Sequence, residues 1–292
     1  MKYACINLRR DHFPVRMMCR LLGISASGYY AWCTRPESTR AKQDRELIPK
    51  IRRVFEVSKG VYGSPRVHAE LVAEGVTVGR NKIARLMRLE RLRGCPKRRF
   101  RVTTRRDPAH PVAKNLLQRN FEARQPNQRW AADMTYISTK QGWLYLAVVM
   151  DLFSRRIVGW SMSQRMGRHL VIGALRMAIE ARRPGGHLIH HSDRGAQYTS
   201  DNFREELARH GIECSMSAAA NCYDNAVVES FFGVLKRERV NRVRYRTRDE
   251  ARADLFEYIE VFYNRKRRHG YLGNVSPADF EKRSAGSFET VH

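Results

Sequence analysis

The chain has 292 residues, which is enough for about two domains, and it carries a formal net charge of +26. Residues 1–125 hold 29 basic and 10 acidic side chains, whereas residues 126–292 hold 26 and 19. This uneven distribution disfavours a merely solvated surface and indicates a polyanion, such as nucleic acid, as partner. Since no stretch has the length or apolarity of a signal peptide or a membrane span, we expect a soluble, intracellular protein.

Over residues 1–50, the sequence predicts an N-terminal helical segment with the helix stop and start signals of a helix-turn-helix. A helical apolar stripe stops at Gly23, and Ser25 can cap a second helix that runs to Trp32. The six cysteines of the chain (5, 19, 33, 95, 214 and 222) form no C-x-x-C motif and accompany no His pair at zinc-ligand spacing. We therefore expect free thiols and no zinc site.

Residues 51–93 predict a second helix-turn-helix, this one a DNA-binding region. Ser64 and Pro65 mark the start of one helix, and a second helix is expected over residues 80–93. Its polar face carries four cations that are free to contact DNA: Arg80, Lys82, Arg85 and Arg88. Spacing alone fits a pair of ordinary helical hairpins equally well, and the basic second helix favours DNA.

Residues 94–125 are expected to be a basic linker. Its prolines and clustered Lys and Arg residues prevent a packed element over most of its length. Such a segment can follow a phosphate backbone, although a solvated connector has the same composition.

Residues 126–240 change to an α/β pattern. Three sequential strands are followed by alternating helices and strands, which predicts a mixed five-stranded sheet with helices on its faces. Residues 241–292 are expected to form a helical extension.

Three acids stand out in this α/β region. Asp133 lies within the first strand, Asp193 ends a later strand, and Glu229 opens a helix after 35 intervening residues. Acids among apolar residues are costly unless they are paired, protonated or bound to a cation. Each alone could be a helix cap or a salt-bridge partner. Together, in a basic chain, they indicate a site for two divalent cations about 4 Å apart that acts on phosphodiesters.

Other polar residues near these acids carry weaker signals. Lys236 shares a helical face with Glu229 and Gly233, so it can reach a phosphate. We interpret Asp151 as structural, paired with Arg155 or Arg156. Residues that flank the acids in loops could contact DNA or only order those loops: Gln197, Tyr198, Tyr223 and Asn225.

His190 and His191 lie beside Asp193. Adjacent residues on a strand face opposite sides, and hard cations held by carboxylates favour oxygen. Metal ligation by either histidine is therefore disfavoured.

The three acids, their spacing and Lys236 resemble the DDE signature of retroviral integrases and related transposases. More narrowly, the motifs H-S-D-R-G-A-Q-Y, C-Y-D-N-A-V-V-E-S-F-F-G-V-L-K and Y-N-R-K-R-R-H-G-Y-L-G-N-V-S-P look like those of OrfB transposases of the insertion-sequence-three family. The resemblance extends over nearly the whole chain. It implies an RNase H-like integrase core in which Asp133, Asp193 and Glu229 are catalytic and bind two Mg²⁺ or Mn²⁺ ions.

The same resemblance implies the reaction and the partners. Water cuts a phosphodiester at an insertion-sequence end, and the freed 3′-hydroxyl attacks a second phosphodiester. The implied partners are double-stranded DNA (terminal inverted repeats and target), an OrfA protein or frameshift fusion, and further copies of the chain on DNA, in the bacterial cytoplasm at the nucleoid. Alternative functions are an RNase H-type hydrolase and a DNA-binding regulator with a catalytically silent core.

Overall fold

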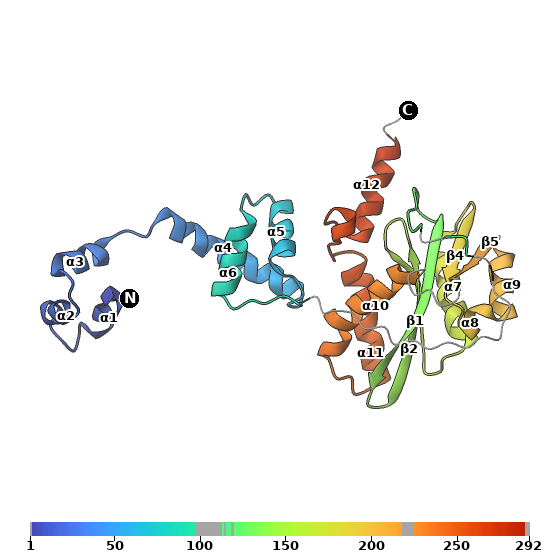
Figure 1. Cartoon of the computed structure of the whole chain (residues 1–292), viewed down its shortest axis with the longest axis horizontal. Coiled ribbons are helices and arrows are strands. Elements are labelled where there is room, and N and C mark those ends of the chain that lie inside the picture. Colours follow the sequence, from blue (N-terminus) through green and yellow to red (C-terminus); the bar gives the residue numbers. More distant parts are fainter. Residues whose placement is uncertain (1, 97–112, 114, 118–119, 218–224, 290–292) are drawn as a thin grey trace.

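The structure is a computed structural model that describes residues 2–96, 113, 115–117, 120–217 and 225–289. Two helical units precede an α/β body that also includes the C-terminal helices (Figure 1). No described helix combines the length and apolarity that crossing a membrane requires.

The first helical unit is built by residues 2–34. Its helices are α1 (Lys2–Arg9), α2 (Val15–Leu21) and α3 (Ala26–Thr34). The predicted turn lies between α2 and α3: Gly23 has a φ of +60°, and the Ser25 hydroxyl accepts a hydrogen bond from the Gly28 amide at 3.1 Å. Ile6 and Tyr29 are buried in its small core.

The second helical unit contains α4 (Thr39–Val57), α5 (Ser64–Ala73) and α6 (Arg80–Leu89). Helix α4 runs without interruption through position 50, because Leu47, Ile51 and Val54 form one buried stripe. Pro65 lies in the first turn of α5, where a missing backbone N–H costs nothing. Helix α6 ends four residues before the expected Arg93, at a turn in which Arg91 has a φ of +56°.

The described residues of the body form a mixed sheet of five strands, which confirms the expected α/β core. The strands are β1 (Arg129–Thr139), β2 (Gly142–Asp151), β3 (Ile157–Ser163), β4 (Leu188–Ser192) and β5 (Ile212–Met216). Their order is β3-β2-β1-β4-β5. Strands β1, β2 and β3 are antiparallel neighbours, whereas β4 runs parallel to both β1 and β5.

Alternating residues of the strands face two different cores. One face packs Trp130 and Ala132 against α7 (Arg168–Arg182), near α8 (Ala196–Thr199) and α9 (Asp201–Arg209). The opposite face packs Ala131 and Ile137 against α10 (Ala226–Glu238), α11 (Arg248–Phe256) and the π-helix η3 (Glu257–Tyr263). The short helices η2 (Val240–Arg242) and η4 (Gly270–Leu272) and the terminal helix α12 (Pro277–Glu289) complete the chain.

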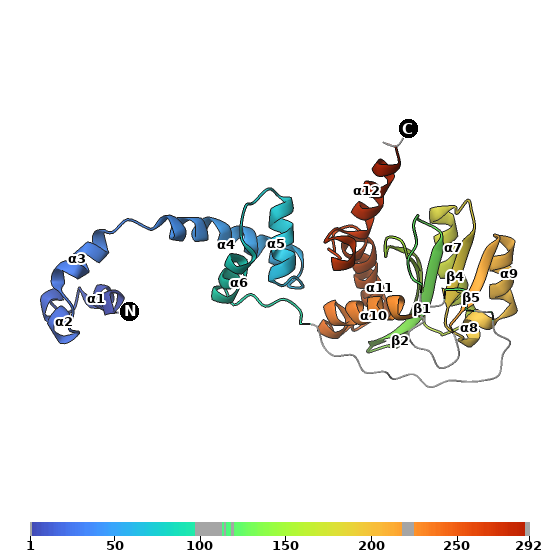
Figure 2. The same ribbon diagram turned by 45° about the horizontal axis from the view of Figure 1, so that its top comes forward.

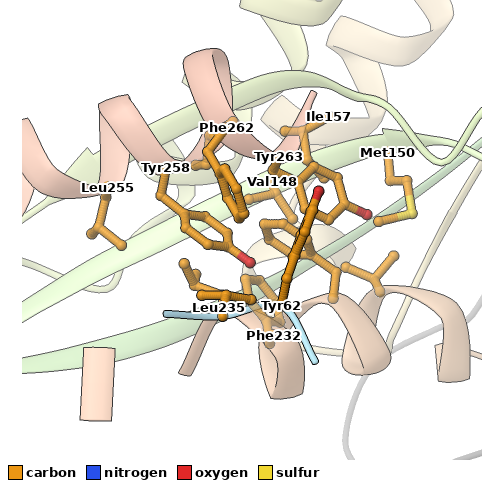
Figure 3. Packing of buried hydrophobic residues seen from close by; sticks show 14 of the residues in the cluster. Tyr62, Val148, Met150, Ile157, Phe232, Leu235, Leu255, Tyr258, Phe262 and Tyr263 are labelled. Atoms are coloured by element: carbon orange, nitrogen blue, oxygen red, sulfur yellow. The ribbon is translucent and has the colours of Figure 1, made fainter. Parts of the chain in front are cut away.

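The second helical unit shares the core of the α10 face. Tyr62, which lies between α4 and α5, packs on Phe262 of η3 with ring centroids 6.3 Å apart (Figure 3). Its hydroxyl donates to the Lys266 carbonyl and accepts from the Arg268 amide. The helix-turn-helix is thereby attached to the C-terminal extension.

Candidate active site

The register of β1 and β4 brings the two aspartates together. Ala131 of β1 pairs with His191 of β4, and each aspartate lies two residues beyond its member of this pair. Strand alternation places Asp133 on the face that α10 covers. Asp193 follows the last residue of β4 and is close enough for its charge to act on Asp133. Glu229, in the first turn of α10, joins them there. This is the carboxyl end of β4, the kind of sheet edge at which α/β proteins bind ligands.

The three carboxyl groups disturb one another electrostatically. Burial raises the pKa of Asp133 well above its usual value, and the nearby charges of Asp193 and Glu229 raise it further. Burial also raises the pKa of Asp193, and burial together with Asp193 raises that of Glu229. Three carboxylates in one partly buried place are thus poorly compensated by the protein alone.

Backbone amides fix the orientation of both aspartates. The Met134 N–H donates to Oδ1 of Asp133 at 2.7 Å, and the Gly195 N–H donates to Oδ1 of Asp193 at 3.0 Å. Each bond leaves the second carboxylate oxygen available for another partner.

The donor set fits a hard divalent cation. Asp133, Asp193 and Glu229 offer only oxygen, which Mg²⁺ and Mn²⁺ prefer over softer metals. Among the described residues, no group of three or more His, Cys, Asp or Glu side chains is arranged so that it could hold a metal ion. The three acids thus offer the oxygen atoms that such a cation takes, but in this structure they do not form a completed metal site.

The face of α10 that follows Glu229 is open. A Cβ atom placed on Gly233 would meet no described atom within 4 Å. Burial lowers the pKa of Lys236, while the charge of Asp133 acts to raise it, which places this ammonium in the field of the acids. Its Nζ lies 5.0 Å from the ring centroid of Tyr136.

Asn225 is buried and binds the backbone beside Asp133. Its Nδ2 donates to the Ala132 carbonyl at 3.1 Å, which attaches the start of α10 to β1. Its loop position in the sequence suggested a possible DNA contact, but the structure gives it the alternative role of ordering the site. The sequence signal for this was its place just before the first turn of a helix.

Tyr198 is also inside the protein. Only 1% of it is exposed, and its ring packs at 5.3 Å from that of Phe203. The expected surface contact with DNA is not available to it, because α8 turns its ring into the α7 core. Gln197, one residue earlier, is partly exposed and lies beside the Asp193 loop. Tyr223 lies outside the described residues.

The two histidines have separate surroundings. His190 pairs with Trp130 in the ladder and faces the other core, where burial lowers its pKa to about 3. His191 faces the side of the acids, but its Nδ1 and Nε2 lie 2.9 and 3.2 Å from the hydroxyls of Ser215 and Ser217. Both placements agree with the interpretation that neither is a metal ligand.

Asp151 is structural, as expected, but its partner differs. Its Oδ2 accepts from Arg182 of α7 at 3.0 Å and from the Asn127 amide at 2.9 Å. Arg156 is not available, because its guanidinium binds Glu281 of α12.

Comparison with known families decides what this arrangement belongs to. Residues 123–222 and 229–284 match two family models described as "Integrase core domain", and residues 42–100 match one described as "HTH-like domain". The transposase InsF for insertion sequence IS3A of Escherichia coli (strain K12) is 43% identical over 286 residues, which cover 97% of this chain and 99% of that protein. The chain belongs to the IS3-family OrfB transposases.

Two further relatives extend the comparison. An uncharacterized 31 kDa protein of insertion element IS600 from Shigella sonnei is 46% identical to this transposase over 266 residues, which cover 91% of the chain and 98% of the relative. The HTLV-2 integrase catalytic core domain in complex with magnesium aligns with 19% identity and a TM-score of 0.42, over 55% of this chain and 99% of that one. The family models and the mixed sheet of five strands show that the transposase has the integrase core that its motifs implied.

The basic helix of the HTH-like region divides into two parts. Arg80 and Arg88 are exposed on α6, as expected of DNA contacts. Lys82 and Arg85 instead form ion pairs with Asp44 of α4, and the Arg85 guanidinium holds the pKa of Asp44 below its usual value. Among the described residues, Arg80 and Arg88 form no ion pair, so their charges are not compensated as those of Lys82 and Arg85 are.

Proposed function

We propose that Asp133, Asp193 and Glu229 are the catalytic residues of this transposase and that they hold two Mg²⁺ or Mn²⁺ ions. The observation that carries the proposal is the meeting of three carboxyl groups with raised pKa values at the end of β4. When bound, such cations activate an attacking oxygen and stabilise a leaving oxygen. Removing one acid from such a set therefore impairs the whole site.

The proposed reaction has two steps of the same kind. Water first replaces the bridging oxygen at a phosphodiester bond of an element end, and this releases a 3′-hydroxyl. That hydroxyl then attacks a phosphodiester of a second strand, so that one bond forms as another breaks. Lys236, on the open face of α10, holds a phosphate of the bound end next to the acids.

The substrate is double-stranded DNA with terminal inverted repeats. The exposed Arg80 and Arg88 of α6 are suited to contact its phosphates, while Lys82 and Arg85 become available if Asp44 releases them. We propose further that the transposase acts as a homo-oligomer on DNA in the bacterial cytoplasm, at the nucleoid, together with an OrfA partner or as a frameshift fusion to it.

Nicking of labelled terminal-repeat DNA in Mg²⁺ tests the proposal. We expect Glu229→Gln to lose at least about 10³-fold in rate, as expected for a residue of a catalytic unit, whereas Glu205→Gln, an exposed acid on α9, should match the wild type. Equal nicking by wild type and Glu229→Gln would reject the catalytic assignment. Binding without nicking by the wild type would favour the DNA-binding regulator.

A further inference from the structure

The hairpin of β1 and β2 exposes two aromatic side chains farther along β1 than Asp133. Tyr136 is 55% exposed and Trp143 is 49% exposed, and their rings meet edge to face with centroids 4.9 Å apart. Trp143 pairs with Ser138 in the ladder, two residues after Tyr136, so both rings are on one face of the hairpin. Such a large exposed apolar pair is typical of a ligand contact.

This aromatic pair lies within reach of the catalytic edge. Tyr136 follows Asp133 by three residues, which corresponds to roughly 10 Å along a strand and places its side chain on the other face of β1. The ladder between β1 and β4 ends at Ala131, so this part of β1 has an edge that β4 does not pair. Lys236 connects the two places, because its Nζ lies over the Tyr136 ring and its charge interacts with Asp133.

Cations lie at and near the turn of the hairpin that carries the aromatic pair. Arg248, at the start of α11, donates from Nε to the Trp143 carbonyl at 3.1 Å. Lys140 at the hairpin turn and Arg246 before α11 are exposed. A ligand that lies on the rings therefore has Lys236 near Tyr136 and Arg248 near Trp143, which suits a base flanked by phosphates.

We propose that Tyr136 and Trp143 form a stacking site for an unpaired nucleobase next to the scissile phosphate. This inference rests on the proposed function, since it assumes that a DNA end lies at the acids. A base that leaves the duplex loses its stacking partners. An aromatic ring that stacks on this base offsets part of the free-energy cost of unpairing the base. The site would hold the end open while the acids act on the neighbouring phosphodiester.

Substrates with paired and unpaired ends test this site. We expect Tyr136→Ala and Trp143→Ala to slow nicking of a fully paired end by about 10-fold or more, the effect of one lost stacking contact. A mismatch at the bases that flank the cut should restore most of the nicking rate of these variants, because the cost of unpairing is already removed. Tyr271→Ala, which removes a 67% exposed ring outside the hairpin, should nick both ends as the wild type does.

Three results would overturn the stacking site. Equal losses on paired and mismatched ends would assign the rings to general DNA binding, and a changed oligomeric mass of the variants would assign them to contact between copies. A photocrosslink from 5-iodouracil at the flanking position keeps the test separate from nicking. We expect the crosslink on Tyr136 or Trp143 in the Ca²⁺ complex. A crosslink at another residue would reject the stacking site. A crosslink at the expected residues, together with no nicking by the wild type in Mg²⁺, would reject only the proposed function.

Discussion

At the scale of single residues, the candidate active site contains carboxyl groups whose negative charge the surrounding protein does not neutralise. Asp133 is partly buried, lies beside two other carboxylates and accepts one backbone hydrogen bond that only partly offsets this cost. Other buried acids of the chain have cationic partners, such as Asp151 with Arg182. This difference supports the catalytic role that we propose for Asp133, since perturbed pKa values cluster at functional sites.

This cost predicts a stabilising substitution. A carboxyl group whose pKa is raised in the folded state binds its proton more tightly there, so the free energy of unfolding falls as pH rises from its usual pKa toward the raised one. Without divalent metal at pH 8, Asp133→Asn should therefore raise the melting temperature, by about 2–4 °C for each kcal/mol recovered. Calorimetry in EDTA measures this, and the gain should vanish near pH 4.

Mg²⁺ supplies the control for that measurement. It should raise the melting temperature of the wild type and have a much smaller effect on Asp133→Asn, because a ligand of the cation is missing. A variant that melts at or below the wild type in EDTA would contradict the electrostatic account of Asp133.

Asn225 predicts a different kind of loss. Asn225→Ala leaves the buried Ala132 carbonyl without its donor, which should cost about 1–3 kcal/mol of stability and displace the start of α10. Nicking should fall more than DNA binding does, since Glu229 is carried by that helix. Denaturant unfolding and nicking measured together test this, with Asn202→Ala, an exposed residue of α9, as the control.

At the scale of elements, periodicity predicted most of the local structure. The alternating W-A-A-D-M-T-Y stretch became β1, and the apolar run before Asp193 became β4, because the strand period of two matches a sheet with two cores. The extent of α6 was wrong, since the pattern did not show that Arg91 turns the chain. The pairing of Lys82 and Arg85 with Asp44 was also hidden, because it depends on where α4 packs.

Because Arg88 of α6 is exposed and Arg85 is paired with Asp44, we predict that their substitutions change the salt dependence of DNA binding differently. Arg88→Ala should weaken binding of DNA and flatten the plot of log K against log [salt] by about one unit, as one lost phosphate contact does. Arg85→Ala should change this slope less, because Arg85 is compensated by Asp44 before DNA binds. Affinities for DNA measured between about 50 and 200 mM salt, where the effect is large, test this difference. Equal slopes for Arg88→Ala and the wild type would show that Arg88 lies on a merely solvated face.

At the scale of the whole molecule, the motif Y-N-R-K-R-R-H-G-Y-L-G-N-V-S-P connects three parts of the chain. The Asn264 side chain binds both backbone groups of Ile157 on β3, and Arg268 pairs with Glu70 of α5. Arg267 forms two hydrogen bonds of 2.7 and 2.8 Å with Glu238, at the end of the helix that carries Glu229. The sequence marked this motif only by resemblance, because its partners lie far away in the chain.

The Glu238 contact predicts a loss of stability that extends to the helix-turn-helix. Although burial acts to raise the pKa of Glu238, Arg267 holds it below its usual value, so the stabilisation is present near neutral pH and is lost as pH falls through that lowered pKa. Glu238→Gln leaves Arg267 buried without its anion and should cost about 3–5 kcal/mol at pH 7. Arg66 of α5 also reaches Glu238, at 3.4 Å.

Thermal unfolding at pH 7 tests this prediction. Glu238→Gln should lower the melting temperature and expose the segment between α4 and α5 to protease, whereas Glu205→Gln should not. Unchanged melting and protection of the variant would show that the buried pair does not hold the second helical unit on the core.

The central claim is that the three acids form one catalytic unit, and single-turnover nicking of terminal-repeat DNA by single and double variants tests it most directly. Residues that act as a unit give losses that do not add. We predict that Asp133→Asn, Glu229→Gln and the double variant all fall to the same residual rate in Mg²⁺. Wild-type nicking by either single variant, or losses that multiply in the double variant, would contradict a shared site.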